Sequence, residues 1–235
     1  DALSAAAGAP GNRRPLRLSG HTGEVEHLMT SGRGDLLVSG SSDGSVRLWP
    51  LVGAAWPIQV DYQRARVLNI RTGEQAAGNI NKNDKHKLSV VVLTIDGACV
   101  VTAQQLEKRK KDGAWLARIK VWEVATGELV HNFNQHHDAP VHVLEAHPLE
   151  SRLVASAGYD ARVYFWDVVA GVCVARYQLS FRLDDRLNPV SFDANSADIF
   201  EGKWHPDGMA FVTTHKNGFT STLSVSNHTA AYGKT

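Results

Sequence analysis

The amino-acid sequence predicts an all-β fold built from about four copies of one four-stranded unit. In "SGSSDGSVRLWP" and "SAGYDARVYFWD" an aspartate stands six residues before a tryptophan, at Asp43/Trp49 and at Asp160/Trp166. A further tryptophan, Trp122, precedes Trp166 by 44 residues. Short runs rich in β-branched residues alternate with turn residues around these markers, as in antiparallel strands. A repeat of about 40–45 residues is typical of the four-stranded blades of a β-propeller.

The first copy shows the predicted strand order most clearly. The run "EVEHLM" (24–29) is expected to be an inner strand, followed by the turn "GRGD" (32–35). The next two strands are "LLVSGS" and "SVRLW", and the dipeptide Asp43–Gly44 between them predicts a tight hairpin. The unit is therefore expected to be an antiparallel meander.

Three further copies follow along the chain. The second runs from "LSVVVLTIDGACVVTA" to "ARIKVWEVATGELV" after an interruption, and the third is "VHVLEAHPLESRLVASAGYDARVYFWDVVAGV". The fourth, "FEGKWHPDGMAFVTTHKNGFTSTLSVS", is degraded, with Thr213, Asn217 and Leu223 in place of the serine, aspartate and tryptophan. We expect units over approximately 18–55, 86–132, 133–177 and 196–226, with a linker over 1–17, insertions over 56–85, 104–116 and 178–195, and a tail over 227–235.

Polar residues recur in the same register in two of the copies. His21 precedes Asp43 by 22 residues and His137 precedes Asp160 by 23, while a serine stands four residues before each aspartate. The aspartate can accept a hydrogen bond from the histidine, which can in turn reach the serine and the indole N–H, so that every buried polar group has a partner. The spacing therefore predicts a structural network whose members are His21, Ser39, Asp43, Trp49, Trp122, His137, Ser156, Asp160 and Trp166.

Two alternative interpretations involve the same histidines. Ser156, His137 and Asp160 resemble a hydrolase triad, but the repetition of the set in two units and the lack of a strained nucleophile elbow argue against catalysis. The histidines of "HHDAPVHVLEAHP" are His136, His137, His142 and His147, yet His142 and His147 fall on a predicted strand and at its far turn. Zinc sites need three or four convergent ligands. We predict no catalytic residue, no metal site and no cofactor.

Composition narrows the class of protein. Hydrophobic residues make up 43% of the chain and charged residues 21%, as in a packed globular domain. With 25 basic and 24 acidic side chains the net charge is +1, so we expect neither membrane association nor direct nucleic-acid binding by the surface as a whole. Two cysteines are too few for a disulfide framework, which favours a reducing compartment.

The motifs as a group resemble those of WD-repeat (WD40) proteins. Gly20–His21, "DGSVRLW" and "YDARVYFWD" carry this resemblance, which covers roughly residues 18–226. The third copy is more narrowly similar to a blade of the bromodomain and WD-repeat family. The resemblance implies a WD40 β-propeller of which about four blades are present here. Since propellers use roughly four to eight blades and this family has more upstream, we expect a partial propeller.

The resemblance also implies a function. Members of this family are chromatin-associated proteins that act in transcriptional regulation and cell-shape control, and as substrate receptors of the cullin-4 ubiquitin ligase. It therefore implies a non-catalytic protein-interaction scaffold in the nucleus, with the cytoplasm as a second location. One departure weakens the ligase role, because Trp166–Asp167 is followed by Val168 and Val169 where such receptors often have an arginine. The alternative is an enzyme with an active site in the central channel.

Two sets of residues are candidates for partner binding. By resemblance, the residue before the hairpin aspartate faces the partner, which selects Ser42, Tyr159 and Lys216. The second set is the basic run Lys108, Arg109, Lys110 and Lys111, in an insertion that replaces the hairpin turn of the second unit. This run is either a solvated loop or a basic finger for an acidic partner, which is a protein segment or a nucleic-acid backbone. The candidate partners are acidic segments, chromatin proteins and the cullin-4 adaptor.

Overall fold

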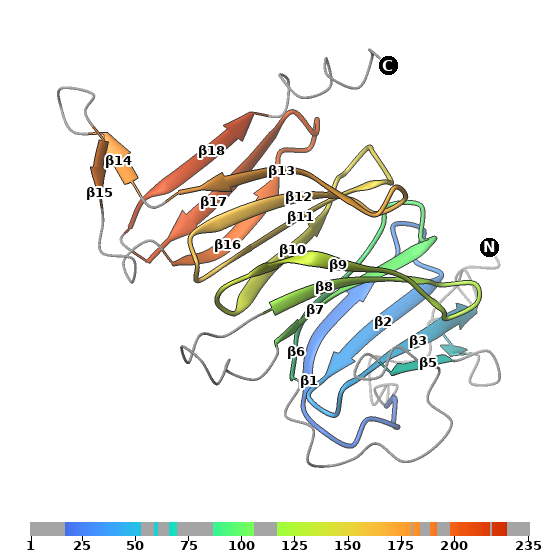
Figure 1. Cartoon of the computed structure of the whole chain (residues 1–235). Coiled ribbons are helices and arrows are strands. Elements are labelled where there is room, and N and C mark those ends of the chain that lie inside the picture. The colour runs from blue at the N-terminus through green and yellow to red at the C-terminus, as the bar shows by residue number, and fades with distance from the viewer. Residues whose placement is uncertain are drawn as a thin grey trace, which may run out of the picture.

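The computed structural model describes residues 17–52, 59–60, 66–69, 87–105, 117–179, 181–183, 189–191, 198–216 and 218–224. These residues form four successive antiparallel sheets, which we call blades 1 to 4, and one small hairpin (Figure 1). Strand order in each blade follows chain order, as the meander pattern predicts. The all-β prediction is therefore confirmed.

The first two blades contain the N-terminal half of the strands. Blade 1 consists of β1 (Val25–Thr30), β2 (Leu36–Ser41) and β3 (Ser45–Val52), and both β4 (Gln59–Val60) and β5 (Arg66–Asn69) pair with β3. Blade 2 consists of β6 (Lys87–Leu93), β7 (Cys99–Gln105), β8 (Ala117–Glu123) and β9 (Leu129–His137). Strand pairing thus enters the expected insertion 56–85, and β9 runs past the expected boundary at residue 132.

The other two blades follow. Blade 3 consists of β10 (Val141–Ala146), β11 (Leu153–Gly158), β12 (Arg162–Asp167) and β13 (Val172–Gln178). Blade 4 consists of β16 (Ile199–Trp204), β17 (Ala210–His215) and β18 (Thr220–Ser224). Within the expected insertion 178–195, β14 (Phe181–Leu183) and β15 (Pro189–Ser191) pair as a separate hairpin.

Each inner strand carries an irregularity near its start. The pairing register shifts around Glu26 in β1, Ser89 in β6, His142 in β10 and Phe200 in β16. A bulge leaves one residue outside the regular ladder and turns its side chain away from the alternation. These four residues occupy the same place in four blades, at the end that also holds the β2–β3 and β11–β12 hairpin turns.

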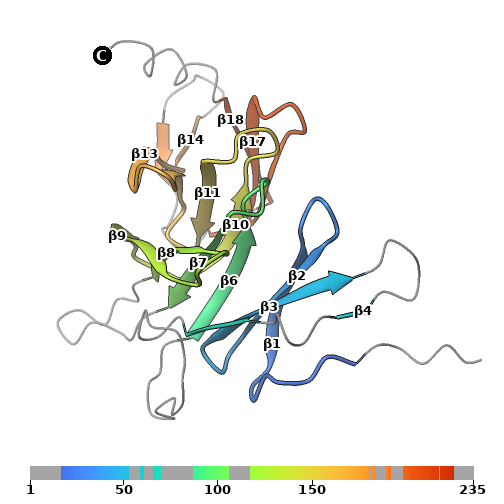
Figure 2. The ribbon, with the colours of Figure 1, turned by 90° about the vertical axis from the view of Figure 1, so that its right-hand side faces the viewer.

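The core lies between neighbouring blades. The inner strands β1, β6, β10 and β16 contact one another in sequence, and Figure 2 shows β6 and β10 side by side. One apolar cluster joins each pair of successive blades, with Trp122 between blades 1 and 2, Trp166 between blades 2 and 3, and Phe211 between blades 3 and 4. Burial of these faces is the main stabilising contribution. The described residues contain no helix long and apolar enough to cross a membrane.

Candidate functional site

A chain of hydrogen bonds crosses blade 1 beneath its hairpin turn. His21 Nδ1 lies 3.0 Å from Asp43 Oδ2, and His21 Nε2 lies 2.7 Å from Ser39 Oγ. The indole Nε1 of Trp49 donates to the same Ser39 oxygen at 2.9 Å. Sequence reasoning expected the histidine to reach the indole N–H itself. In the structure the serine stands between them, because its hydroxyl both accepts and donates.

Blade 3 repeats this geometry. His137 Nδ1 lies 3.0 Å from Asp160 Oδ1, His137 Nε2 lies 2.8 Å from Ser156 Oγ, and Trp166 Nε1 donates to Ser156 Oγ at 2.8 Å. A carboxylate only accepts, so in the neutral ring Nδ1 carries the proton and Nε2 accepts from the serine hydroxyl. The donors therefore run in one direction, from the indole through the serine and the histidine to the aspartate.

This arrangement does not suit nucleophilic catalysis. The side chain of Ser156 is fully buried, and its oxygen already accepts the indole N–H of Trp166. A nucleophilic serine must instead present its oxygen to a substrate carbonyl beside an oxyanion hole. What the network can do chemically is satisfy buried polar groups and fix the hairpin turn to the preceding loop.

The two aspartates are held in their charged form. Burial by itself raises the pKa of Asp43, but hydrogen bonds from His21, Ser45 and the Thr22 amide outweigh it and hold this pKa below its usual range. Burial likewise acts against the charged form of Asp160, and His137 with the Asp138 and Arg162 amides lowers its pKa below the ordinary value. Each carboxylate thus stabilises the fold in its ionised state.

Among the residues that the structure describes, blades 2 and 4 show only part of the network. In blade 2, Trp122 Nε1 donates to Thr102 Oγ1 at 3.0 Å, so a threonine takes the place of the serine. In blade 4, Thr213 Oγ1 lies 3.1 Å from His215 Nε2. Sequence reasoning did not include Thr102 or His215. The signal for Thr102 lay in its own strand, since "VVTA" (100–103) matches "LVSG" (37–40) and "VASA" (154–157), with Thr102 at the serine position. An alignment on Trp122 hides this match, because the insertion places Thr102 20 residues before Trp122 where each serine precedes its tryptophan by 10.

The remaining histidines of the "HHDAPVHVLEAHP" stretch do not converge with His137. His142 stacks on Tyr159, whereas His147 donates from Nε2 to the Gly208 carbonyl at 2.9 Å, at the opposite end of β10. The side chain of His136 lies outside the described residues. Among the side chains that the structure describes, no group of three or more His, Cys, Asp or Glu could hold a metal ion.

An aromatic surface lies at the hairpin-turn end of blades 3 and 4; we define it as His142, Tyr159 and Phe200. The ring of Tyr159 stacks on His142 with centroids 4.1 Å apart and meets Phe200 edge-on at 5.6 Å. Phe200 is 48% exposed. The three residues come from β10, the β11–β12 turn and β16, and two of them are the bulge residues of their strands. Sequence reasoning selected Tyr159 but missed the other two, because a bulge breaks the alternation on which strand predictions rest.

Charged groups border this surface. Lys216 Nζ lies 3.4 Å from Asp198 Oδ2 in the blade 4 turn region. Burial lowers the pKa of His142, while the Asp198 carboxylate opposes the shift, so the ring is neutral at neutral pH. Of the three residues selected by resemblance, Tyr159 belongs to the surface and Lys216 to its border. Ser42 lies in the blade 1 turn, where its hydroxyl accepts the Glu24 amide at 2.9 Å.

The basic run Lys108, Arg109, Lys110 and Lys111 lies outside the described residues. It follows β7 and precedes β8 in the chain. Its role as a basic finger therefore stays a prediction.

Comparison with known proteins identifies WD repeats in two parts of the chain. The profile of the WD domain, G-beta repeat matches residues 13–50 and 127–167, which contain the networks of blades 1 and 3. The chain is 27% identical over 204 residues to a bromodomain and WD repeat-containing protein of Dictyostelium discoideum, a match that covers 86% of this chain and 8% of that protein. It is 23% identical over 192 residues to the ribosome biogenesis protein WDR12 homolog of Oryza sativa subsp. japonica, covering 80% of this chain and 39% of the relative.

A solved structure shows the same fold. The β-propeller domain of Cps50 (Swd1) from Myceliophteria thermophila matches with a TM-score of 0.60 at 16% identity, covering 91% of this chain and 56% of that one. The chain thus spans about half of that structure and less than a tenth of the bromodomain relative. Its repeated Ser-His-Asp-Trp networks, meander blades and profile matches show that it is a WD40-repeat protein with a β-propeller fold.

Proposed function

We propose that this chain is a non-catalytic scaffold that binds a partner protein through the aromatic surface. The main observation in support of this proposal is that the ring of Tyr159 stacks on His142 and meets the half-exposed Phe200. WD40 domains generally bind protein partners. Tyrosine and other aromatic side chains are enriched at binding hot spots, because they bury a large area at low entropic cost.

The structure of the turn supports a preorganised site. The Tyr159 amide donates to the Pro140 carbonyl at 3.0 Å, and the neighbouring Asp160 belongs to the buried network. The tyrosine backbone is therefore fixed before a partner arrives, and its ring is supported by His142 on one side. Preorganisation of this kind reduces the entropy lost on binding.

We also propose a class of partner for this scaffold. The similarity to a bromodomain and WD repeat-containing protein supports a chromatin-associated role in transcriptional regulation and cell-shape control, with nuclear localisation. Chromatin proteins and acidic segments are then the proposed partners. Imaging of the tagged full-length protein tests the location, and a purely cytoplasmic signal would contradict it.

The proposed contact with the cullin-4 adaptor needs a site other than the end of β12. Asp167 accepts hydrogen bonds from the Val169 and Ala170 amides and forms an ion pair with Arg152. The "WD" aspartate of blade 3 thus closes its own turn and is already engaged. Purified adaptor added to the chain tests the contact directly, and absence of a complex would remove the ligase role.

Affinity capture from nuclear extract tests the main proposal. We expect the double variant Tyr159→Ser, Phe200→Ser to lose the specific partners that the wild-type chain retains, while the melting temperature changes little. Val172→Ser is the matched control, since Val172 is 45% exposed on the outer strand of blade 3. An unchanged partner set in the double variant would contradict the proposed surface.

The basic run gives a separate prediction. Replacing Lys108, Arg109, Lys110 and Lys111 by Glu is expected to change the free energy of unfolding by no more than about 0.5 kcal/mol, the usual range for surface changes. If the run contacts an acidic partner, the variant will associate more slowly, and more so at low salt. Capture at two salt concentrations measures this effect, and identical partner sets would identify the run as a solvated loop.

A further inference from the structure

The end of the blades opposite the aromatic surface is a row of four neighbouring turns, of which the last three are linked by hydrogen bonds. We call it the inner-turn end; it consists of the turns β1–β2, β6–β7, β10–β11 and β16–β17 (31–35, 94–98, 147–152 and 205–209). Ser151 donates a side-chain hydrogen bond to Asp96, which joins the turns of blades 2 and 3. His147 donates to the Gly208 carbonyl at 2.9 Å, which joins those of blades 3 and 4. The row is therefore held in place by the fold itself.

Each of three successive turns presents one large apolar side chain to solvent. Ile95 is 45% exposed, Leu149 is 70% exposed and Met209 is 52% exposed. A single exposed apolar residue needs no explanation. Three on neighbouring turns, although at different positions within those turns, form a row, and rows of this kind mark protein interaction sites.

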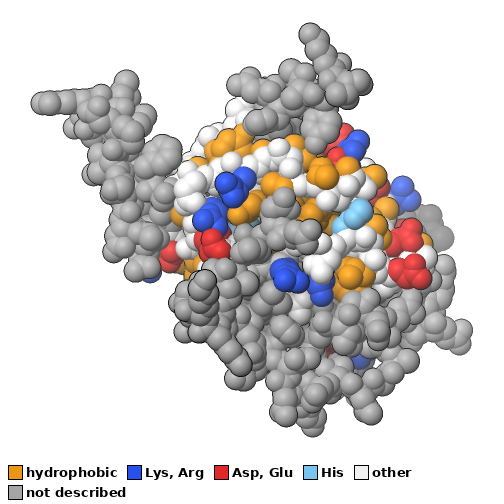
Figure 3. All heavy atoms as spheres, in the orientation of Figure 1, with side chains coloured by type: hydrophobic (Ala, Val, Ile, Leu, Met, Phe, Trp, Pro, Cys, Tyr) orange, Lys and Arg blue, Asp and Glu red, His pale blue; other side chains and the backbone are white. Residues whose placement is uncertain are grey.

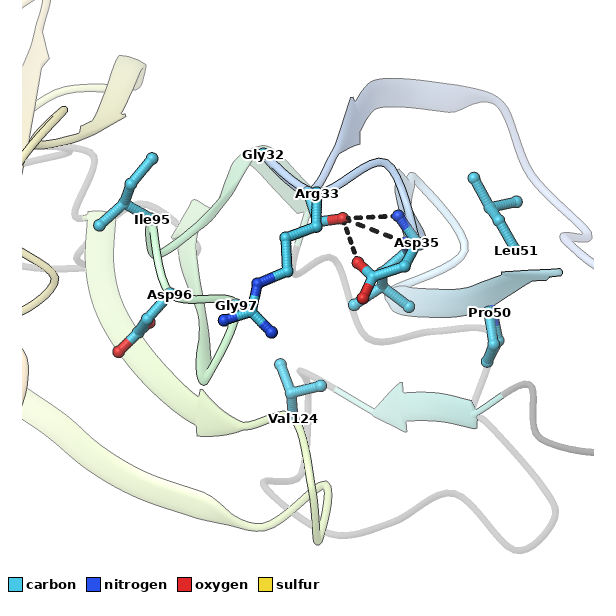
Figure 4. A pocket seen from close by; sticks show the side chains of 11 residues that line it. Gly32, Arg33, Asp35, Pro50, Leu51, Ile95, Asp96, Gly97 and Val124 are labelled. Atoms are coloured by element: carbon cyan, nitrogen blue, oxygen red, sulfur yellow. Dashed lines mark hydrogen bonds between the residues drawn. The ribbon is translucent and has the colours of Figure 1, made fainter. Parts of the chain in front are cut away.

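A cavity opens at the blade 1 end of this row. It has a volume of about 390 Å³ and lies between the turns of blades 1 and 2 (Figure 4). Its apolar lining residues are Leu36, Pro50, Leu51, Ile95 and Val124. Ile95 belongs both to the row and to the cavity wall, so the two features are continuous. The cavity suits a bulky apolar side chain inserted by a partner.

The charges around the row are mainly negative. Carboxylates outnumber guanidinium groups in these turns. In Figure 3 acidic side chains share the right-hand edge of the described surface with apolar side chains and a few basic ones. The exposed carboxylates of this end and its adjoining β8–β9 turn are Asp35, Asp96, Glu128, Glu150 and Asp207. Arg152 is neutralised by its ion pair with Asp167. The complementary partner surface is therefore basic.

One basic side chain lies at the cavity. Arg33 extends across it in Figure 4, and the described residues show no ion pair with its guanidinium. A guanidinium has only donors. It can therefore donate to backbone carbonyls of an extended segment without requiring an acidic side chain there.

We propose that the inner-turn end binds a partner protein through a segment in which a bulky apolar residue is flanked by lysine or arginine. The apolar residue occupies the cavity beside Ile95, a second apolar contact falls on Leu149, and the basic residues face the carboxylates. This binding end is separate from the aromatic surface, so a scaffold with both ends can hold two partners at once. Failure of either proposal leaves the other intact.

Selection from a peptide library tests the proposal, because it needs no purified partner. A phage-displayed random peptide library is first depleted on the variant Ile95→Asp, Leu149→Asp and then selected on the wild-type full chain. Depletion removes peptides that bind elsewhere, including the aromatic surface. We expect the survivors to combine a bulky apolar residue with lysine or arginine on both sides. No survivors, or survivors that are acidic or uncharged, would overturn the proposal.

The selected peptides are then synthesised, and their affinities for the chain are measured by fluorescence anisotropy. We expect Ile95→Ser to weaken binding about tenfold or more, as for loss of a central apolar anchor, and high salt to weaken it further. Val25→Ser, at the hairpin-turn end, is the matched control because Val25 is 53% exposed. If the variant Ile95→Asp, Leu149→Asp fails to melt cooperatively, Ile95→Ser replaces it in the depletion step. Equal affinity of the peptides for Ile95→Ser and for the wild type would refute the site. Sedimentation gives a second check: a wild-type chain that is a dimer, together with an Ile95→Ser variant that is a monomer, would show that the surface binds a second copy of the chain and would also refute the proposal.

Discussion

At the scale of single residues, the partial network of blade 2 predicts a graded effect on stability. Ser156→Ala removes the partner of both the Trp166 indole and His137, and stranded buried polar groups cost about 1–3 kcal/mol. Thr102→Val removes only the hydrogen bond that the Trp122 indole donates to the hydroxyl. Urea unfolding should therefore show the larger loss for Ser156→Ala. An equal or reversed order would mean that the histidine contributes nothing to the network.

The depressed pKa of Asp160 predicts a pH dependence of the same network. A carboxyl with a lowered folded-state pKa stabilises above its unfolded pKa of about 3.9, and this contribution is lost as the pH falls through the folded value. The melting-temperature gap between wild type and Asp160→Asn should therefore be full at pH 6 and shrink below about pH 4. A gap that stays constant down to pH 2 would contradict the assigned ionisation.

Residue identities could be predicted from the sequence where the register of the repeat is preserved. The Ser-His-Asp-Trp sets of blades 1 and 3 meet as the spacing suggests, because each member occupies a fixed place in a regular hairpin. His142 and Phe200 could not be assigned to one surface from the sequence. They are bulge residues on two strands 58 positions apart, and no alternation pattern marks them.

At the scale of elements, substitutions at two equivalent turn glycines distinguish the cost of backbone strain from the contribution of a contact between blades. Gly97 and Gly208 both have φ of +74°, in the left-handed region. A Cβ at Gly97 would meet nothing within 4 Å, whereas one at Gly208 would lie 2.2 Å from His147 Cε1.

Gly97→Ala should accordingly cost only the backbone term, about 1–2 kcal/mol in the free energy of unfolding. Gly208→Ala should cost at least about 1 kcal/mol more, since the ring must move and its hydrogen bond to the Gly208 carbonyl is strained. Chemical denaturation of the two variants measures the difference. Equal losses would show that the link between blades 3 and 4 does not contribute to stability.

Whether a strand could be predicted from the sequence depended on the amino-acid composition of its segment. β1 to β3 were visible because apolar β-branched runs flank a clear Asp-Gly turn. β4 and β5 lie in a polar stretch and are short, so the segment 56–85 was expected to be an insertion throughout. Their pairing with β3 depends on the edge that blade 1 offers, which is a tertiary effect that local sequence does not encode.

At the scale of the whole molecule, the four blades present two ends with different chemistry. The hairpin-turn end carries the aromatic surface, and the inner-turn end carries exposed apolar residues among carboxylates. The buried networks lie beneath the first of these ends, fixing its turns to the preceding loops. The sequence could predict the propeller and the networks, but the two surfaces required the spatial neighbourhood of different blades. The blade number of the whole protein stays a prediction.

The most direct test of this account compares two variants for both unfolding and partner binding. His137→Ala should lower the stability by about 1–3 kcal/mol yet retain partner binding at temperatures where it is folded, because its role is structural. Tyr159→Ser should keep the wild-type melting temperature and lose the partner. The account would be contradicted if His137→Ala kept its melting temperature while losing all binding, since the histidine would then belong to a functional site and not to the fold.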